Sequence, residues 1–248
     1  MNSNDAVINP VRGGKSPDPG PVVILVSGKK DFQALCGLFK GKPSRSMDFL
    51  MSRICTFSDE EHHFSVVGPI IGAPYAAILL ENLIAWGAQK VVFFGLCGSI
   101  SPEIKIGDIL LPTGSFIEEG TSLHYGGKTG DISMGSEDIL LQLKTAFLQE
   151  QLDVREGVVW TTDAVFRETR ELVCAYQEKN ALGVEMELSA LFTIGNYRGI
   201  DVGAVLVVSD ELSTFQWKPG FGTARFKKQC KSVQRMISKL CLTLRPKT

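Results

Sequence analysis

The stretch KVVFFGLCGSI, Lys90 to Ile100, combines an apolar run of strand-forming residues with a tail of small ones. The run Val91–Phe94 puts no polar side chain on either face, which is typical of a strand buried on both sides within a parallel sheet. The small residues 95–99 predict a turn after this strand, where exposed backbone N–H groups could hold a ligand. A tight strand-to-helix turn would use the same residues, so both interpretations stay open.

Short apolar runs alternate with helical periodicity on both sides of this stretch. Strands are expected at 21–28, 62–70, 107–117, 155–165 and 201–212, and helices at 29–41, 73–88, 136–152, 167–180, 187–199 and 223–244. The first helix is expected to close at Gly41 and the second to stop at Gly87. Apolar strands that alternate with amphipathic helices predict an α/β fold with a mostly parallel sheet, covered on both faces.

The helix expected at 223–244 has the clearest amphipathic pattern in the chain. Its lysines fall on one side, and the opposite stripe consists of Phe226, Cys230, Val233, Met236, Ile237 and Leu240. We therefore expect this stripe to pack against the sheet.

The two ends of the chain differ in composition. Residues 1–20 are rich in Pro, Gly, Asn and Ser and offer little to bury, which predicts a flexible N-terminal tail. No repeat or internal linker interrupts the remainder, so residues 21–248 are predicted to form a single domain.

The overall composition excludes several classes of partner. The formal net charge of −1 gives no general attraction to nucleic acid or to an anionic membrane. The longest apolar runs are too short to span a bilayer, and no secretory leader pattern opens the chain. The six cysteines stand singly in apolar surroundings, which favours reduced thiols in a cytoplasmic protein. With only three histidines, we expect no metal site.

Polar clusters are expected where three of the buried strands end. Besides residues 95–99, they are TTDAVFRET after Trp160 and SDEL after Val208. Ligands in α/β folds bind beyond the carboxyl ends of strands, so these clusters predict a site. Asp210 in SDEL fits either a helix cap or a catalytic acid. The glycine-flanked loop FIEEGTSLHYGG, with Thr121 and His124, predicts a supporting loop, although a solvated hairpin would look similar.

The segment GVEMELSALF, Gly183 to Phe192, places two carboxylates around Met186 in an apolar neighbourhood. Glu185 and Glu187, two positions apart, would share a face of a strand but not of a helix. Lys179 or Arg198 would neutralise them if the pair were structural. Alternatively, a carboxylate accepts charge-assisted hydrogen bonds from vicinal hydroxyls, such as those of a ribose, with Met186 beneath the sugar.

Six motifs, in order over about residues 21–245, together resemble the nucleoside phosphorylase family. They are GPIIGAPYAA, KVVFFGLCGSISPEIKIGDILLP, EEGTSLHY, WTTDAVF, GVEMELSALF and VLVVSDEL. The family includes hexameric purine nucleoside phosphorylases, uridine phosphorylases and methylthioadenosine/adenosylhomocysteine nucleosidases. The resemblance implies a three-layer α/β/α fold with a mixed, mostly parallel sheet. It also implies a nucleoside substrate, no cofactor beyond phosphate as co-substrate, and homo-oligomers built from dimers, up to hexamers.

The resemblance also implies roles for individual residues. Asp210 matches the acid that protonates or hydrogen-bonds N7 of a purine as the glycosidic bond breaks, and Arg225 would assist it. The segment between them, STFQWKPGFGTA, looks like an insertion. Glu187 would hold the 2′- and 3′-hydroxyls of the ribose, with Glu185 and Met186 beside it. The base would lie against Cys97, Gly98, Val165, Phe166 and Val184.

The phosphate site departs from the family pattern. Gly28, Gly95 and Leu96 correspond to its phosphate or water site, but Leu96 replaces a hydroxyl residue. Phe32 and Phe93 stand where phosphorylases of the family carry arginines. Buried dianionic phosphate would be poorly compensated there. Replacement charge is expected from Lys29, Lys30, Arg45, Arg53 or Arg167.

Three functions therefore remain open on the sequence. The leading one is phosphorolysis of a purine or pyrimidine nucleoside, which is a pentosyltransferase reaction. The second is hydrolysis of the same bond, with Asp31 the nearest acid to activate water. The third is a catalytically inactive nucleoside-binding homologue, against which the presence of Asp210 argues.

Overall fold

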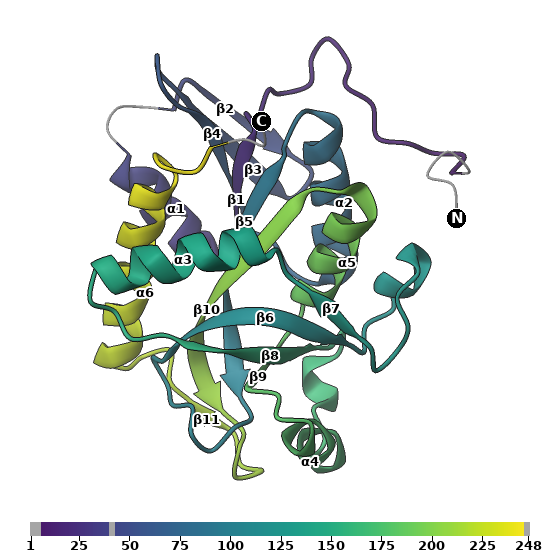
Figure 1. Cartoon of the computed structure of the whole chain (residues 1–248), viewed down its shortest axis with the longest axis vertical. Helices are drawn as coiled ribbons and strands as arrows, with labels where there is room; N and C mark the ends of the chain where they lie inside the picture. Colours follow the sequence, from purple (N-terminus) through teal and green to yellow (C-terminus); the bar gives the residue numbers. More distant parts are fainter. Residues whose placement is uncertain (1–5, 40–42, 246–248) are drawn as a thin grey trace.

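A computed structural model describes residues 6–39 and 43–245 and builds its sheet around four parallel strands. They are β1 (Val22–Val26), β4 (His63–Gly68), β5 (Lys90–Ser99) and β10 (Asp201–Glu211). β1 lies between β4 and β5, and β5 pairs with β10 on its other side (Figure 1). Their apolar runs are buried on both faces, as expected for central parallel strands.

A second group of strands bends the sheet back on itself. It consists of β6 (Ile109–Ile117), β8 (Arg155–Thr161) and β9 (Gly183–Glu185). β10 pairs antiparallel with β6, β6 and β8 are parallel, β8 and β9 are parallel, and β9 returns antiparallel to β5. These pairings close a small barrel at one end of the sheet. The mixed sheet is confirmed, whereas its closure through the three-residue β9 was not predicted.

Four strands at the margins of the sheet were also not predicted. They are β2 (Arg45–Phe49), β3 (Ser52–Ser58), β7 (Ile132–Met134) and β11 (Lys218–Pro219). β3 pairs antiparallel with β4 and β2 with β3, while β7 and β11 pair with β6 and β10. The exposed β2, with the sequence RSMDF, has no apolar run that periodicity could detect. It is a strand because β3 supplies its hydrogen-bond partners.

Helices cover both faces of the sheet and confirm the three layers. On one face lie α1 (Lys29–Leu38), α3 (Glu137–Gln149) and α6 (Ala224–Leu240), and on the other lie α2 (Ala73–Ala85) and α5 (Leu188–Arg198) (Figure 1). α4 (Arg170–Glu178) covers a smaller cluster at the barrel end. The predicted helix end at Gly41 falls outside the described residues.

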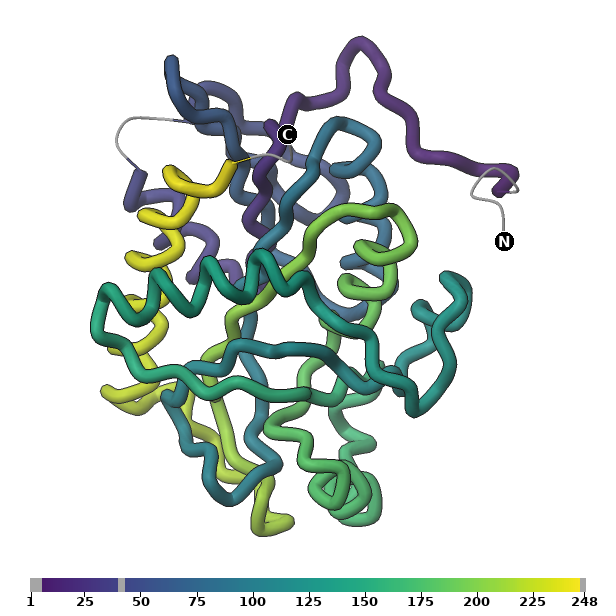
Figure 2. Tube along the Cα trace, in the orientation of Figure 1, coloured from purple at the N-terminus to yellow at the C-terminus, as the bar shows by residue number. Residues whose placement is uncertain are grey.

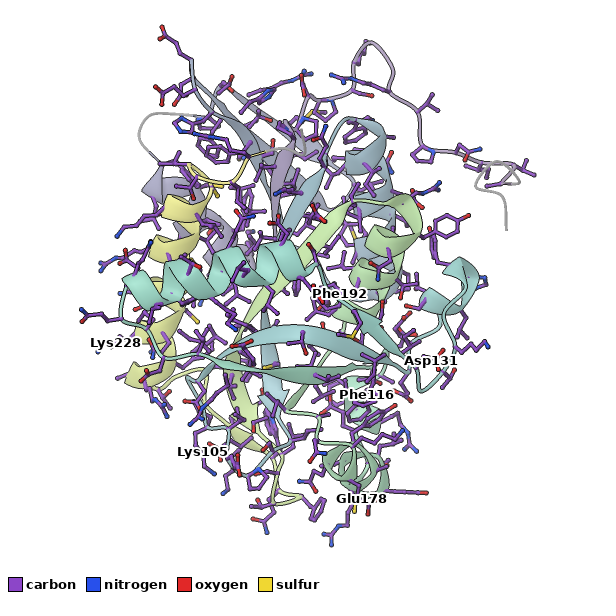
Figure 3. The ribbon with its side chains drawn as sticks, in the orientation of Figure 1. Lys105, Phe116, Asp131, Glu178, Phe192 and Lys228 are labelled. Atoms are coloured by element: carbon purple, nitrogen blue, oxygen red, sulfur yellow. The ribbon has the colours of Figure 1, made fainter. Side chains whose placement is uncertain are left out.

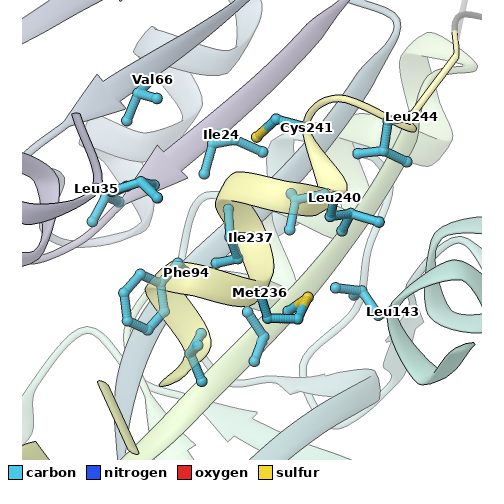
Figure 4. Close-up of a cluster of buried hydrophobic side chains, with 14 of the residues drawn as sticks. Ile24, Leu35, Val66, Phe94, Leu143, Met236, Ile237, Leu240, Cys241 and Leu244 are labelled. Carbon is cyan, nitrogen blue, oxygen red and sulfur yellow. The ribbon is translucent and has the colours of Figure 1, made fainter. Parts of the chain in front are cut away.

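The stripe predicted on α6 is confirmed. All six of its apolar residues are buried, and Figure 4 shows Ile237 on the side of Phe94 in β5 and Met236 beside Leu143 of α3. Figure 3 shows Lys228, on the opposite side of the helix, pointing away from the body. α5 differs because α2, β6, β7, β10 and the 3₁₀ helix η1 (Ser122–Tyr125) all contact it, so its residues 188–195 are buried in succession.

The predicted turn at residues 95–99 is wrong, because β5 continues to Ser99. Gly98 pairs with Val184 of β9 on one side and with Asp210 of β10 on the other. Hydrogen bonding from both sides keeps these small residues in a strand. For the same reason Asp210 lies within β10 and not after it.

The N-terminal segment 6–20 runs outside the sheet without helix or strand, and it turns at Gly13–Ser16 (Figure 2). The indole Nε1 of Trp86 donates to the Val11 carbonyl at 3.2 Å, and Arg12 pairs with Asp18 at 3.4 Å. The flexibility predicted for residues 1–20 stays a prediction, as does a single domain over 21–248. None of the helices in the described part of the chain is long and apolar enough to cross a membrane.

Candidate active site

Asp210 lies near the carboxyl end of β10, where the pairing with β5 is irregular. The register shifts between Val208 and Asp210, and such a bulge re-aims the side chains beside it. The Ser209 hydroxyl lies 2.6 Å from Asp210 Oδ1, and the Trp217 indole Nε1 donates to Oδ2 at 2.9 Å. Both carboxylate oxygens therefore have a donor that fixes their orientation.

Three of the predicted base-binding residues lie beside this carboxylate. A Cβ on Gly98 would come within 3.1 Å of Asp210 Oδ2, 3.4 Å of Val184 and 2.5 Å of Leu212. Burial raises the pKa of the Cys97 thiol, and the nearby charges of Asp210 and Glu185 raise it further. The structure therefore brings Cys97, Gly98 and Val184 together with Asp210.

The other two predicted base-binding residues are more exposed. Val165 and Phe166 lie on the 3₁₀ helix η2 (Val165–Arg167), with 45% and 97% of their surface exposed. Glu168, which follows η2, was not singled out by sequence reasoning. Its burial and the charge of Asp210 raise the pKa of Glu168 to about 7. Glu168 therefore lies near enough to Asp210 for the two charges to interact.

Glu185 is a buried carboxyl group, and both of its oxygens accept hydrogen bonds from the protein itself. The Thr161 hydroxyl donates to Oε1, and the backbone N–H groups of Glu187 and Leu188 donate to Oε2 at 2.7 and 2.8 Å. Thr161 Oγ1 in turn accepts the Ser189 N–H at 2.9 Å. Glu185 therefore anchors the first turn of α5, because helix N-termini have unpaired N–H groups.

Glu187 does not belong to the same strand as Glu185, which corrects the prediction that the two share one face of a strand. β9 ends at Glu185, and Glu187 is the residue that precedes α5. Its side chain is buried and its Oε1 accepts the Gly72 N–H at 2.5 Å. Gly72 has a φ of +80°, a conformation that favours glycine and presents this N–H to the site.

Neither expected cation neutralises these glutamates, so the salt-bridge interpretation is wrong. Arg198 forms a bidentate pair with Glu81 at 2.9 Å, and the Lys179 ammonium lies over the rings of Tyr176 and Phe116. Over residues 6–39 and 43–245, no ion pair involves Glu185 or Glu187. Burial raises the pKa of both carboxyl groups, and the charge of Glu187 adds to the rise at Glu185.

This raised pKa predicts how stability depends on pH. A carboxyl group with a raised pKa binds its proton more tightly in the folded state than in the unfolded state. Its contribution to folding stability is therefore largest at a pH below the ordinary pKa of glutamate, and it is lost as the pH rises from there through the raised pKa. We expect Tm to fall between pH 5 and pH 8. In Glu185→Gln, which has no titrating group there, the fall should be smaller by about 5 °C. Thermal melts across this range check it, with the exposed Glu178→Gln as control; equal slopes for wild type and Glu185→Gln would contradict it.

Trp217 was missed by sequence reasoning, although it contacts Asp210 directly. It is 64% exposed and lies in the segment that looked like an insertion. That segment is fastened to α4, because Gln177 Nε2 donates to the Ser213 carbonyl at 3.1 Å and the Arg170 guanidinium lies 5.1 Å from the centroid of the Phe215 ring. Only the fold brings these distant residues together.

Arg225 has a different partner from the one expected. Its guanidinium hydrogen-bonds to Asp108 and not to Asp210, and its side chain is 56% exposed. The described contacts therefore give no support for a role of Arg225 in assisting Asp210.

The supporting loop forms the 3₁₀ helix η1 (Ser122–Tyr125) and is fixed to α5. The buried Glu119 carboxylate accepts the N–H groups of Thr121 and Ser122 and the hydroxyl of Ser189. His124 lines a cavity of about 710 Å³ between η1, α2, α5 and the N-terminal segment. The backbone of Thr121 thus helps to hold the loop on Glu119, while His124 lines this cavity and has no described contact with Asp210 or Glu187.

The positions expected to hold phosphate are apolar and packed. Phe32 and Phe93 are buried in the two main core clusters, and Leu96 packs against the first. A Cβ on Gly95 would lie 2.4 Å from the Phe93 ring, so this glycine makes room for the phenylalanine.

Gly28, which precedes α1, faces a carboxyl group. Its Cβ position is 2.6 Å from Asp31 Oδ2, while Asp31 Oδ1 accepts a hydrogen bond from Gln234 at 2.8 Å. Burial raises the pKa of Asp31. An acid therefore lies beside Gly28.

Comparisons with solved structures give the fold. The chain is similar to a purine nucleoside phosphorylase from Toxoplasma gondii in complex with immucillin-H, with a TM-score of 0.79, 19% identity, and coverage of 91% of this chain and 92% of that one. It is also similar to a uridine phosphorylase from Vibrio fischeri, with a TM-score of 0.74, 23% identity and 90% of each chain covered.

Comparisons with curated proteins give relatives in the same family. The chain is 30% identical over 151 residues to a DeoD-type purine nucleoside phosphorylase of Clostridium novyi, covering 60% of this chain and 65% of that protein. It is 30% identical over 142 residues to a guanosine phosphorylase of Halorubrum lacusprofundi, covering 57% and 58%. The chain thus spans less than two thirds of the length of these relatives. The family model of the phosphorylase superfamily matches residues 21–244, and the chain therefore belongs to the phosphorylase superfamily.

Proposed function

We propose that the chain cleaves the N-glycosidic bond of a nucleoside with phosphate, giving free base and ribose 1-phosphate. The observation that carries the proposal is Glu187, a buried carboxylate without a cationic partner in the described part of the chain. A buried acid of this kind needs donors, and the vicinal hydroxyls of a ribose supply them. The names of the purine nucleoside and guanosine phosphorylase relatives favour a purine substrate.

The proposed mechanism divides the work between two carboxyl groups. Glu187 accepts hydrogen bonds from the 2′- and 3′-hydroxyls and so fixes the sugar. As the bond to the base breaks, the sugar becomes an oxocarbenium ion and the base gains electrons. A proton held by Asp210 at N7 of a purine stabilises this leaving base, which is general acid catalysis. Ser209 and Trp217 keep the Asp210 side chain oriented for this contact.

A specific observation favours hydrolysis as the second candidate. Phosphate needs compensating charge, yet the expected positions hold Phe32, Phe93 and Leu96 in apolar packing, and Asp31 lies beside Gly28. An acid at this position could activate water. In this alternative the sugar and base contacts are unchanged and only the nucleophile differs.

A panel of purine and pyrimidine nucleosides, incubated with the purified chain with and without phosphate, tests both candidates. Phosphorolysis predicts release of base only with phosphate, with ribose 1-phosphate as the second product. Free ribose at a rate independent of phosphate would establish hydrolysis instead. Saturable nucleoside binding without any released base would overturn both and leave a binding protein.

The remaining features of the proposal concern the setting of the reaction. No cofactor is required beyond phosphate. A homo-oligomer built from dimers and a cytoplasmic location are part of the proposal. The cysteines support the proposed cytoplasmic location, since all six lie in the described part of the chain and are free thiols.

The Trp217→Phe variant tests how Asp210 is oriented. It keeps the aromatic ring but removes the N–H that donates to Oδ2, so we expect kcat to fall by about 3- to 10-fold. Tm should stay unchanged, because the side chain is largely exposed. Steady-state kinetics with Phe221→Leu, from the same segment, as control would measure this. An unchanged kcat would show that Ser209 alone positions the acid.

A further inference from the structure

Two cysteines that the proposed reaction does not use lie at the core cluster between α1 and the sheet. Cys55 in β3 is the register partner of Val66 in β4, and both belong to the core cluster that α1 covers. Cys36 lies on α1 and packs against the same cluster. Figure 4 shows Leu35, the chain neighbour of Cys36, near Val66 in this cluster. The helix and the strand therefore bring the two thiols onto one face of the sheet.

The surroundings of the pair distinguish its two sulfurs. Ser46, opposite Cys55 on β2, places its hydroxyl 3.5 Å from Cys55 Sγ. Hydrogen bonds from Cys36 and Ser46, with the nearby charge of Arg53, lower the pKa of Cys55, although burial and the Asp48 charge oppose them. The contact with Cys55 and burial raise the pKa of Cys36. Cys55 is thus the sulfur that has a further hydrogen-bond partner, the Ser46 hydroxyl, which can stabilise its ionised form.

The other four cysteines have no such arrangement. Burial raises the pKa of Cys97, Cys230 and Cys241, which makes them poor nucleophiles. Cys174 is exposed on α4, where its thiol faces Glu178 at 3.8 Å. A thiolate adjacent to a second thiol is the arrangement that oxidation converts into a disulfide.

We propose that Cys36 and Cys55 form an oxidation site that a hydroperoxide closes into a reversible intramolecular disulfide. The Cys55 thiolate attacks one peroxide oxygen, the O–O bond breaks, and hydroxide or alkoxide leaves, so Cys55 becomes a sulfenic acid. The Cys36 sulfur then attacks Cys55 Sγ and the S–O bond breaks. Water leaves with the Cys36 proton, and the S–S bond remains.

The disulfide would join α1 to β3 and so fasten the helix that follows Gly28. Cys36 is half-buried whereas Cys55 is almost wholly covered, so the oxidant reaches the pair from the side of Cys36. A thiol reductant restores both cysteines by exchange.

Peroxide titration of the full chain in a Cys174→Ser background tests the proposal. Limiting hydrogen peroxide should remove two thiols per chain, counted after denaturation, and dithiothreitol should restore both. Peptide mapping without reduction should find Cys36 linked to Cys55 within one chain. In Cys36→Ser, whose half-buried position tolerates serine, one thiol should be lost and a sulfenic-acid reagent should label Cys55. Ser46→Ala should slow the thiol loss at least threefold.

Other results would overturn the proposal. The buried Cys230 is the internal control, and the pair should react at least tenfold faster. Equal rates for Cys36, Cys55 and Cys230 would show that no special site exists. Linkage between chains, or thiol loss in Cys36→Ser without labelling of Cys55, would contradict the assigned partners. Matching Tm values for Cys36→Ser and its background verify that the fold is intact.

Discussion

The Asp210→Asn variant is expected to lose about 10²- to 10⁴-fold in kcat for a purine nucleoside. Asparagine has nearly the same shape, and its oxygen can still accept the Trp217 N–H, so the fold and the pocket should be retained. What the variant lacks is the proton that stabilises the leaving base. Steady-state kinetics with wild type and Asp210→Asn at saturating phosphate give the ratio.

Two controls separate proton donation from a loss of structure. Asp108→Asn changes an acid that pairs with Arg225 and should leave kcat within about threefold of wild type. A nucleoside whose purine already carries a positive charge through methylation at N7 needs no proton there. With that substrate, Asp210→Asn should lose less than about tenfold. A near wild-type kcat on the ordinary nucleoside would remove Asp210 from the mechanism.

Replacing Glu187 with alanine is expected to raise KM by about 30- to 1000-fold, equivalent to about 2–4 kcal/mol. The carboxylate is buried, so its hydrogen bonds to the sugar hydroxyls form where water does not compete. Its removal leaves those hydroxyls and the Gly72 N–H without an acceptor. Initial rates over a range of nucleoside concentrations measure KM.

The matched control for Glu187→Ala is Glu187→Gln, which keeps one oxygen to accept hydrogen bonds and should lose less. A 2′-deoxynucleoside provides a second comparison. Because it lacks one of the two hydroxyls, the loss caused by Glu187→Ala should be smaller with it than with the ribonucleoside. An unchanged KM for Glu187→Ala would show that Glu187 is structural and would leave the sugar contact unassigned.

Elements that depend on local pattern could be predicted from the sequence. The stripe on α6 follows from apolar periodicity, and the buried strands β1, β5 and β10 follow from continuous apolar runs. The structure confirms both. The cap of α3 is equally local, since the Ser136 hydroxyl accepts the Ile139 N–H three residues later. In each case the interactions that decide the element lie within a few residues of one another.

The details of the site depend on long-range contacts and could not be predicted. The small residues 95–99 are strand because β9 and β10 pair with them, and neither pairing is visible in the sequence. The contact between Trp217 and Asp210 and the pairing of Arg225 with Asp108 are likewise set by the fold. The role of Glu185 was within reach, because its hydrogen bonds to the N–H groups two and three residues later are local.

A crystal structure of the chain with a bound nucleoside tests the central claim most directly. The account predicts the Glu187 carboxylate within about 3 Å of both the 2′- and 3′-hydroxyl oxygens, with the base facing Asp210. A well-ordered nucleoside whose sugar is held by other residues, with Glu187 still bound only within the protein, would contradict it.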